Sequence, residues 1–333
     1  MDAFVPAPVP RVLVLGGAGF IGRHAVAALL GHGLRPIVGS RRPARAGGRL
    51  PPDAHDCPRR EVHVERLLEP ADWQDKIADV DVVLNCVGIL RQRGRETYER
   101  VHHLGPAALA AACRERGVRL VHVSALGLSA DARSRFIRSK RAGDRAIRAS
   151  GANACIVRPS LLDAERGGYG ASWLRRVARW PVHPLPAGAC GRIAALDVRD
   201  LGEALARLVL RRRLAGPDGP DEFELGGAED FSLRDYVARL RSAAARPPAR
   251  YLPLPDALVR VGSHLCDLLH VTPFSFGHWE LLQRDNRPAR ADLARLLGRA
   301  PRRIGGGEHA VVPVPAPAYS FTPCATPCLV RRS

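Results

Sequence analysis

The sequence predicts an α/β fold, with a doubly wound parallel sheet and a small C-terminal cap region. Three observations support this prediction. Short apolar runs alternate with longer amphipathic segments through the first half of the chain. The first apolar run breaks into a cluster of glycines that opens a helical segment. The chain has 333 residues, which is enough to bury a large core. Strands that alternate with helices form parallel sheets with helices on both faces.

The first element pair is a mainly apolar strand at residues 11–15 and a helix at 21–30. Glycine suits the turn between them, because the turn requires backbone angles that a Cβ disfavours and because a pyrophosphate must approach bare N–H groups. The flanking strand and helix strengthen a motif that is weak alone. We therefore expect a Rossmann-like dinucleotide site, the alternative being an ordinary glycine-rich turn. The expected nucleotide-binding residues of the turn are Gly16, Gly17, Ala18, Gly19, Phe20, Ile21, Gly22 and Arg23.

Apolar runs, helical periodicity and Gly or Pro stops predict the remaining elements in order. Strands are expected at 35–39, 61–64, 80–87, 120–124 and 154–158, and helices at 72–78, 98–116 and 135–150. Beyond Pro159 we expect helices at 172–180, 201–211, 232–245 and 256–269, and extended segments at 193–198, 222–226 and 251–255. The predicted organisation is an extension at 1–10, a nucleotide-binding domain at 11–230, a mainly helical region at 231–304 and a disordered Gly/Pro-rich tail at 305–333.

The composition narrows the class of protein. The net charge of +18 is spread along the chain, and aromatic residues for base stacking are few, so no nucleic-acid partner is expected. A phosphorylated ligand or an anionic membrane surface suits this charge better. No apolar run reaches the roughly 18 residues of a membrane span, and we expect a cytoplasmic protein, peripheral at most at the inner face of the membrane. Cys324 and Cys328 form the one close cysteine pair, and no metal site is expected.

The end of the second strand indicates which dinucleotide binds. Folds that select NAD usually place Asp or Glu there, whereas this chain has Ser40, Arg41 and Arg42. Guanidinium groups suit a 2′-phosphate, and a serine adds a hydrogen bond. We therefore favour NADP(H), with NAD(H) as the alternative. The competing interpretation is that both arginines are ordinary surface residues.

Further candidate residues follow the later strands. Asn85, Val87 and Gly88 come at the end of one strand, Ser124 ends the next, and Pro159 ends a third. Ligands of open α/β sheets bind at this carboxyl edge. Phe136 and Lys140 lie one helical turn apart and so share a face. Lys140 is one of only two lysines, which suggests that an arginine would not serve there.

In this order and spacing, over about residues 10–230, these motifs resemble the atypical and extended short-chain dehydrogenase/reductase superfamily, which includes the NAD-dependent epimerase/dehydratase-like proteins. Residues 81–90, 120–127, 134–144 and 282–286 are similar to bacterial relatives of the complex I nucleotide-binding accessory subunit, alpha-subcomplex subunit nine. The resemblance implies NAD(P) binding and a partner in a respiratory or quinone-biosynthesis complex. Where the superfamily often has Asp-Leu near the adenine, this chain has Arg66 and Leu67.

The resemblance also implies a catalytic Tyr-x-x-x-Lys pair, in which the phenol exchanges a proton while the lysine lowers its pKa and holds the nicotinamide ribose. Phe136 stands at the tyrosine position and cannot supply that proton. Lys140 is retained, and so is Ser124, which either binds a carbonyl or bonds to local backbone. We expect little or no turnover, with the nucleotide as a structural or redox-sensing ligand. A surrogate acid at Tyr169 is disfavoured.

Two alternatives stay open. One is an active oxidoreductase or epimerase acting on a quinone precursor, an isoprenoid or a nucleotide-sugar. The other is a membrane-surface assembly factor, which the mixture of tryptophans and arginines in helix 172–180 supports modestly. The preferred interpretation of that helix is that it packs on the substrate cleft.

Overall fold

The computed structural model describes residues 9–165, 167–216, 219–269 and 275–305. Its centre is an eight-stranded sheet in the order β10-β11-β6-β5-β4-β1-β2-β3. All neighbours are parallel except the β10–β11 pair. This confirms the predicted doubly wound sheet, whose order reverses between β1 and β4. The strands are β1 (Val12–Leu15), β2 (Ile37–Ser40), β3 (Arg59–Glu61), β4 (Val82–Asn85), β5 (Arg119–Val123), β6 (Ala154–Pro159), β10 (Ala215–Gly216) and β11 (Gly219–Leu225).

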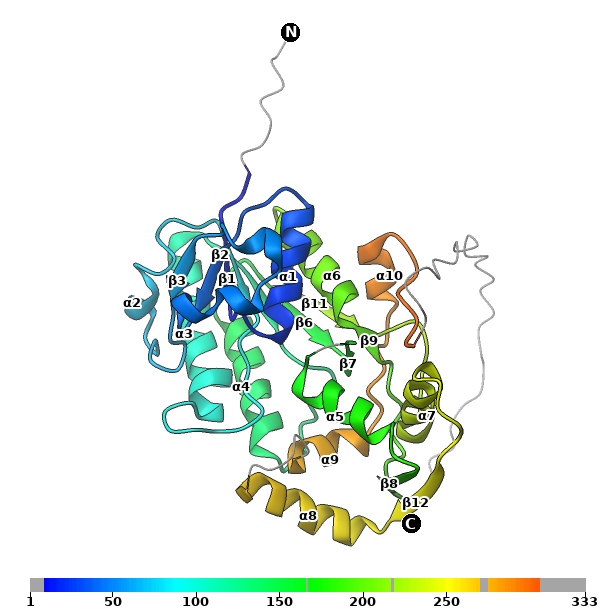
Figure 1. The fold of residues 1–333 in the computed structure, drawn as a ribbon. Helices are drawn as coiled ribbons and strands as arrows, with labels where there is room; N and C mark the ends of the chain where they lie inside the picture. The colour runs from blue at the N-terminus through cyan, green and yellow to red at the C-terminus, as the bar shows by residue number, and fades with distance from the viewer. Residues whose placement is uncertain (1–8, 166, 217–218, 270–274, 306–333) are drawn as a thin grey trace, which may run out of the picture.

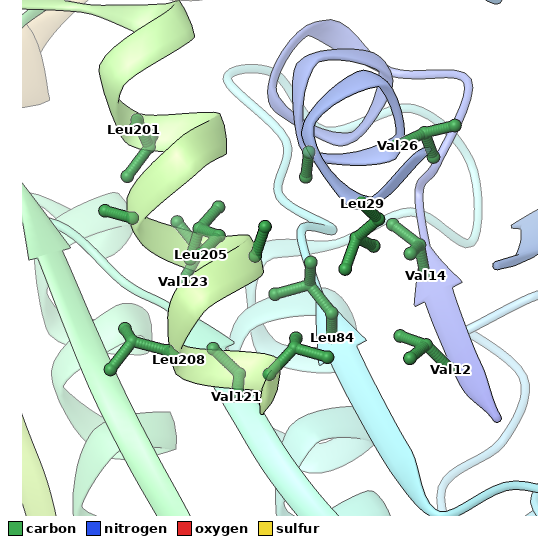
Figure 2. Packing of buried hydrophobic residues seen from close by; sticks show 14 of the residues in the cluster. Val12, Val14, Val26, Leu29, Leu84, Val121, Val123, Leu201, Leu205 and Leu208 are labelled. Atoms are coloured by element: carbon green, nitrogen blue, oxygen red, sulfur yellow. The ribbon is translucent and has the colours of Figure 1, made fainter. Parts of the chain in front are cut away.

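Helices cover both faces of the sheet (Figure 1). On one face lie α1 (Phe20–Gly31) and α6 (Val198–Leu210), and on the other lie α3 (Gly105–Arg116) and α4 (Arg135–Ala149). Successive strand residues point to opposite faces. Val12 and Val14 therefore pack with the α1–α6 side (Figure 2), whereas Leu13 and Leu15 pack with the α3–α4 side. All four side chains are at most 1% exposed.

Several elements differ from their predicted bounds. The strand expected at 61–64 is β3, two residues earlier. The helix expected at 72–78 is a single turn, α2 (Pro70–Trp73), which begins early because Glu69 and Asp72 form a capping box around Pro70. The helix expected at 98–116 is a π-helical segment, η4 (Glu99–Leu104), that continues into α3. Pro106 has no N–H with which to continue an α-helical ladder, and this explains the altered register before it.

The C-terminal half adds a smaller assembly beside the carboxyl edge of the sheet (Figure 1). The Pro-rich segment near residue 184 forms a strand that the sequence did not indicate, and this strand pairs in parallel with the extended segment near residue 252. Tyr236 is buried beneath this assembly, and its hydroxyl donates to Asp163 Oδ1 at 2.8 Å. The elements are α5 (Tyr169–Val177), β8 (Val182–Pro186), α7 (Leu233–Ala243), β12 (Arg250–Leu254), α8 (Asp256–Leu269) and α9 (Phe276–Leu282).

The chain then returns to the nucleotide side. Helix α10 (Asp292–Leu297) packs in the same hydrophobic cluster as α1 and α6. Just beyond it, Arg299 donates to Asp200 at 2.6 Å, and so does the backbone N–H of Arg302. Asp200 of α6 is fully buried, so residues 299–302 are fixed to α6.

The short pair β7 (Leu162–Asp163) and β9 (Leu196–Asp197) replaces the longer strand expected at 193–198.

Within the described residues, no helix combines the length and hydropathy that crossing a bilayer requires. Residues 1–8 of the extension expected at 1–10, most of the tail expected from residue 305, and the Cys324–Cys328 pair lie outside those residues.

The packing of α4 on η4 gives a stability prediction. A Cβ built on Gly143 would lie 1.9 Å from the carbonyl oxygen of His102, which is backbone and cannot move aside cheaply. We expect Gly143→Ala to lower the free energy of unfolding by about 1–3 kcal/mol, as overpacking does. Urea unfolding followed by circular dichroism measures the change.

Gly31→Ala is the matched control, because Gly31 is the last residue of α1 and a Cβ there meets no atom within 4 Å. Its stability should stay equal or rise by up to about 1 kcal/mol. Equal effects of the two substitutions would contradict the predicted close contact.

Candidate functional site

The glycine turn between β1 and α1 forms a bare backbone cradle. Gly16 has a φ of +69°, which disfavours other residues. A Cβ on Gly22 would lie 2.2 Å from the carbonyl oxygen of Gly16, and one on Gly17 would lie 3.0 Å from that of Val14. The first turn of α1 carries no acidic residue and no side-chain cap. Its N–H groups are therefore available to a pyrophosphate, and the cradle fits a dinucleotide.

The other predicted residues of this turn support the cradle. Ala18 and Ile21 pack against the hydrophobic cluster beneath it. Gly19 donates its N–H to Gly16 at 2.8 Å and closes the turn. Phe20 and Arg23 form the outer side, with the guanidinium 5.7 Å from the ring centroid.

A second glycine loop lies against that outer side. Gly167 and Gly168 have φ values of +80° and +74°. A Cβ on Gly167 would lie 2.2 Å from an Arg23 nitrogen, and one on Gly168 would lie 2.6 Å from the Phe20 ring. The loop therefore borders the pyrophosphate cradle, which the sequence analysis did not predict although the adjacent glycines were a visible signal. The side chain of Tyr169 lies outside the described part of the structure.

The end of β2 holds the three residues expected to select the dinucleotide. The Ser40 hydroxyl is buried and has no hydrogen-bond partner in the described structure. Arg42 is exposed and forms no ion pair with a described residue. Arg41, however, is paired with Glu96, on the loop that follows β4. The orphaned hydroxyl and the exposed guanidinium fit a phosphorylated ribose, while Arg41 already has a competing carboxylate.

Asn85, Val87 and Gly88 shape the exit of β4. The buried Asn85 accepts a hydrogen bond from the Val87 N–H at 3.0 Å and lies 3.1 Å from His122 Nδ1. Its amide therefore fixes the turn at the end of β4. A Cβ on Gly88 would lie 3.8 Å from Lys140 Nζ. Glycine keeps the strand end open beside the lysine, as a nicotinamide ribose would require.

Ser124, Phe136 and Lys140 meet at the carboxyl edge of β5 and the start of α4. The Ser124 hydroxyl is buried and lacks a hydrogen-bond partner among the described residues. Lys140 Nζ lies 6.0 Å from the centroid of the Phe136 ring. Burial lowers the pKa of the Lys140 ammonium, and the Asp144 carboxylate opposes that shift. Pro159 ends β6 beside this edge and is buried.

Two buried histidines, which the sequence analysis missed, complete this region. His102 Nε2 accepts the Ile89 N–H at 3.1 Å, so the ring proton is on Nδ1, 3.1 Å from Ser139 Oγ. Burial holds the pKa of His102 well below its usual value and lowers the pKa of His122 to about 4. Both shifts favour the neutral imidazole, which keeps one N–H donor.

Phe136 lies within an aromatic cluster. Its ring centroid is 5.4 Å from His102, 5.8 Å from Tyr98 and 5.9 Å from His278. The Tyr98 hydroxyl donates to the Leu90 carbonyl at 2.9 Å. The cluster therefore has the hydrocarbon ring of Phe136 at the position where the resemblance implies a tyrosine. The nearby phenol of Tyr98 is hydrogen-bonded to the backbone.

Helix α9 fixes the start of α4. The Glu280 carboxylate accepts the N–H groups of Arg133 and Ser134 at 2.8 and 2.9 Å. The Ser134 side chain makes no such cap itself. A Cβ on Gly277 would lie 2.7 Å from Ser134 Oγ, so the two helices touch closely.

A cavity of about 770 Å³ lies beside Phe136. Arginines and aromatic rings from four separate segments border it, which suits an amphipathic ligand with a polar or anionic group. The lining includes Arg91, Tyr98, Arg133, Arg135, Arg260 and Phe276.

The helix expected at a membrane surface, 172–180, is α5 with the residues after it. Trp173 and Leu174 are partly buried and pack against the cluster around Tyr236. Trp180 meets Trp173 edge to face at 6.0 Å and is 39% exposed. Most of this helix therefore serves the packing of the C-terminal assembly.

Comparison with known proteins agrees with this geometry. A family model described as NAD(P)H-binding matches residues 16–175. A ceramide reductase of Caulobacter vibrioides is 31% identical over 314 residues, covering 90% of this chain and 93% of the relative. The mitochondrial complex I alpha-subcomplex subunit 9 of Arabidopsis thaliana is 27% identical over 74% of this chain, which spans 61% of that relative.

Among solved structures, the NADPH-dependent quinone oxidoreductase QOR2 of Escherichia coli in complex with NADPH aligns with a TM-score of 0.66 at 17% identity, covering 88% of this chain and 97% of the other. A UDP-glucose 4-epimerase of Thermus thermophilus in complex with NAD aligns with a TM-score of 0.54 at 20% identity, covering 74% and 86%. With the glycine cradle, the sheet order and these relatives, the chain belongs to the family of NAD(P)H-binding proteins that includes the Caulobacter ceramide reductase, and the complex I subunit 9 proteins are among its homologues.

Proposed function

We propose that this protein holds NADP(H) as a bound ligand and transfers hydride from it slowly or not at all. The observation that carries the proposal is Phe136, which lies beside Lys140 in a buried aromatic cluster at the position of the expected phenol. The nicotinamide supplies or accepts a hydride when the dinucleotide is bound. General acid catalysis contributes about 10²–10⁴-fold in rate, and this chain lacks that donor at the expected place.

The residues that would hold the nucleotide are independent of that donor. The N-terminus of α1 receives the pyrophosphate, and Ser40 with the exposed Arg42 receives the phosphorylated ribose. Lys140 has no ion-pair partner among the described residues and would bind the nicotinamide ribose. Ser124 is positioned to donate to a carbonyl oxygen. Nucleotide binding therefore does not depend on catalysis, because only the proton transfer needs a phenol.

The complex I relatives support a partner in a respiratory or quinone-related assembly, where a nucleotide that is retained without turnover would act as a structural or redox-sensing ligand. This partner stays a prediction.

A second candidate is a reductase acting on a ceramide-like lipid. The Caulobacter ceramide reductase supports it, since the match covers nearly the whole of both chains. The cavity beside Phe136 gives room for an amphipathic substrate. In this case the proton for the carbonyl oxygen would come from Tyr98 or from water.

The first prediction concerns dinucleotide preference. We expect NADPH to bind more tightly than NADH, because Ser40 and Arg42 offer a hydrogen bond and a positive charge to the 2′-phosphate. Arg42→Ala should weaken NADPH by about 10- to 100-fold, as loss of a charge-assisted hydrogen bond does, and leave NADH unchanged. Isothermal titration with both nucleotides measures the difference.

Glu96→Gln releases Arg41 from its ion pair and should tighten NADPH binding without affecting NADH binding. Arg41→Ala should weaken NADPH binding. Arg49→Ala removes one exposed arginine of the same region and serves as the charge control. A wild type that prefers NADH, or an equal response to Arg42→Ala and Arg49→Ala, would show that these arginines do not bind the phosphate.

The second prediction concerns catalysis. Phe136→Tyr places a phenol one turn from Lys140 and should raise carbonyl reduction by about 10²–10⁴-fold. The assay is NADPH oxidation with quinones, nucleotide-sugar ketones and ketone forms of sphingoid lipids. Lys140→Ala should weaken nucleotide binding both in the wild type and in Phe136→Tyr. Ser124→Ala should remove the increase in carbonyl reduction that Phe136→Tyr produces.

The two candidate functions differ in the wild type. Rapid wild-type reduction of a sphingoid ketone that disappears in Ser124→Ala would replace the first candidate by the second. Tyr98→Phe then distinguishes a Tyr98 proton, which that substitution removes, from a solvent proton, which it leaves in place.

A further inference from the structure

One end of the molecule carries a concentration of exposed apolar side chains. The structure describes nine exposed large hydrophobic residues, and six of them belong to α8, to β12 or to β8 with the residue two before it. We call these six the apolar face. They are Trp180, Val182, Leu252, Leu258, Val261 and Leu265.

Helix α8 presents one apolar stripe outward. Leu258, Val261 and Leu265 are 66%, 58% and 52% exposed, and their spacing of three and four residues places them along one side of the helix. On the opposite side Val259 and Ser263 are buried, at 8% and 0%. The exposed apolar stripe is therefore distinct from the side by which α8 packs on the rest of the protein.

The β8–β12 pair extends the stripe. Val182 lies directly opposite Arg250 in the parallel register, and Leu252 follows two residues later on the same face of the pair. Leu252 is 50% exposed and Val182 39%. β12 leads into α8 through residue 255, so the strand pair lies next to the start of the helix at this end of the molecule (Figure 1).

The polar residues around the apolar face are mostly cationic. Arg179, Arg250 and Arg260 are exposed beside it, whereas the acidic Asp256 is tied to the Gly188 N–H at 2.9 Å. Aliphatic and tryptophan side chains bordered by arginines suit a bilayer interface with anionic headgroups, because the chains enter the acyl boundary while the guanidinium groups meet phosphates.

The apolar face also adjoins the candidate site. Arg260, Val261 and His264 of α8 line the same cavity as Phe136. A lipid at a docked bilayer would therefore lie within one helix width of the cavity.

We propose that the apolar face docks this protein peripherally on an anionic lipid bilayer. α8 lies in the interface, and the cavity beside Phe136 opens next to the lipid. The proposal goes beyond nucleotide binding and does not depend on whether the protein turns over.

Flotation of the full-length protein tests the proposal, with vesicles of phosphatidylcholine alone and of phosphatidylcholine mixed with phosphatidylglycerol. We expect the wild type to float with the anionic vesicles, more weakly as salt increases, and to float poorly with the neutral ones. The double variant Leu258→Asp/Leu265→Asp should reduce the bound fraction by roughly tenfold, because it places two charges on the exposed stripe that would enter the bilayer. Arg260→Glu should reduce it to a smaller extent.

Leu210→Asp is the matched control. Leu210 is 42% exposed at the end of α6, away from the apolar face, so this variant should float like the wild type. NADPH titration of every variant shows whether the nucleotide domain remains folded. That measurement is independent of flotation, so loss of folding can be distinguished from loss of membrane binding.

Three outcomes would overturn the proposal. One is a wild type that fails to float. A second is equal loss of flotation in Leu258→Asp/Leu265→Asp and Leu210→Asp. The third is a dimer in solution that the double variant dissociates, which would assign the face to a second copy of this chain.

Discussion

The site depends on one close approach, that of α4 to the π-helical segment η4. At residue 143 only a hydrogen fits against the His102 carbonyl oxygen. This contact places His102 within hydrogen-bond distance of Ser139 and beside the Phe136 ring. It also directs Lys140 toward the glycine at the end of β4. The same contact therefore fixes the lysine that would hold ribose and the ring that replaces the phenol.

The cofactor side and the reaction side are built differently. The cofactor side is backbone, with glycines at close approaches and buried hydroxyls that lack protein partners. The reaction side is packed side chains, in which His102, Tyr98 and Phe136 contact one another. Loss of a proton donor can therefore be tolerated on one side without damage to the other, which is why a retained cradle does not by itself establish turnover.

The sequence predicted what local pattern determines. The glycine turn, the sheet with helices on both faces, and the shared face of Phe136 and Lys140 each follow from spacing within a few residues. It did not predict the Arg41–Glu96 pair, the packing of His278 on Phe136, or the β8–β12 pair. Those contacts join segments between 55 and 142 residues apart, and no local pattern encodes them. The boundary errors at α2 and η4 arose from capping and proline effects near Pro70 and Pro106.

The Glu280 cap has a consequence for the order of synthesis. The carboxylate that completes the N-terminus of α4 lies 146 and 147 residues downstream of Ser134 and Arg133, the residues that it caps. As the chain leaves the ribosome, the sheet strands up to β6 can pair while α4 still lacks this partner. The helix that carries Phe136 and Lys140 is thus completed only after nearly all of the described chain has been made. A nascent or shortened chain of this kind would contain the nucleotide cradle before it contained a finished reaction side.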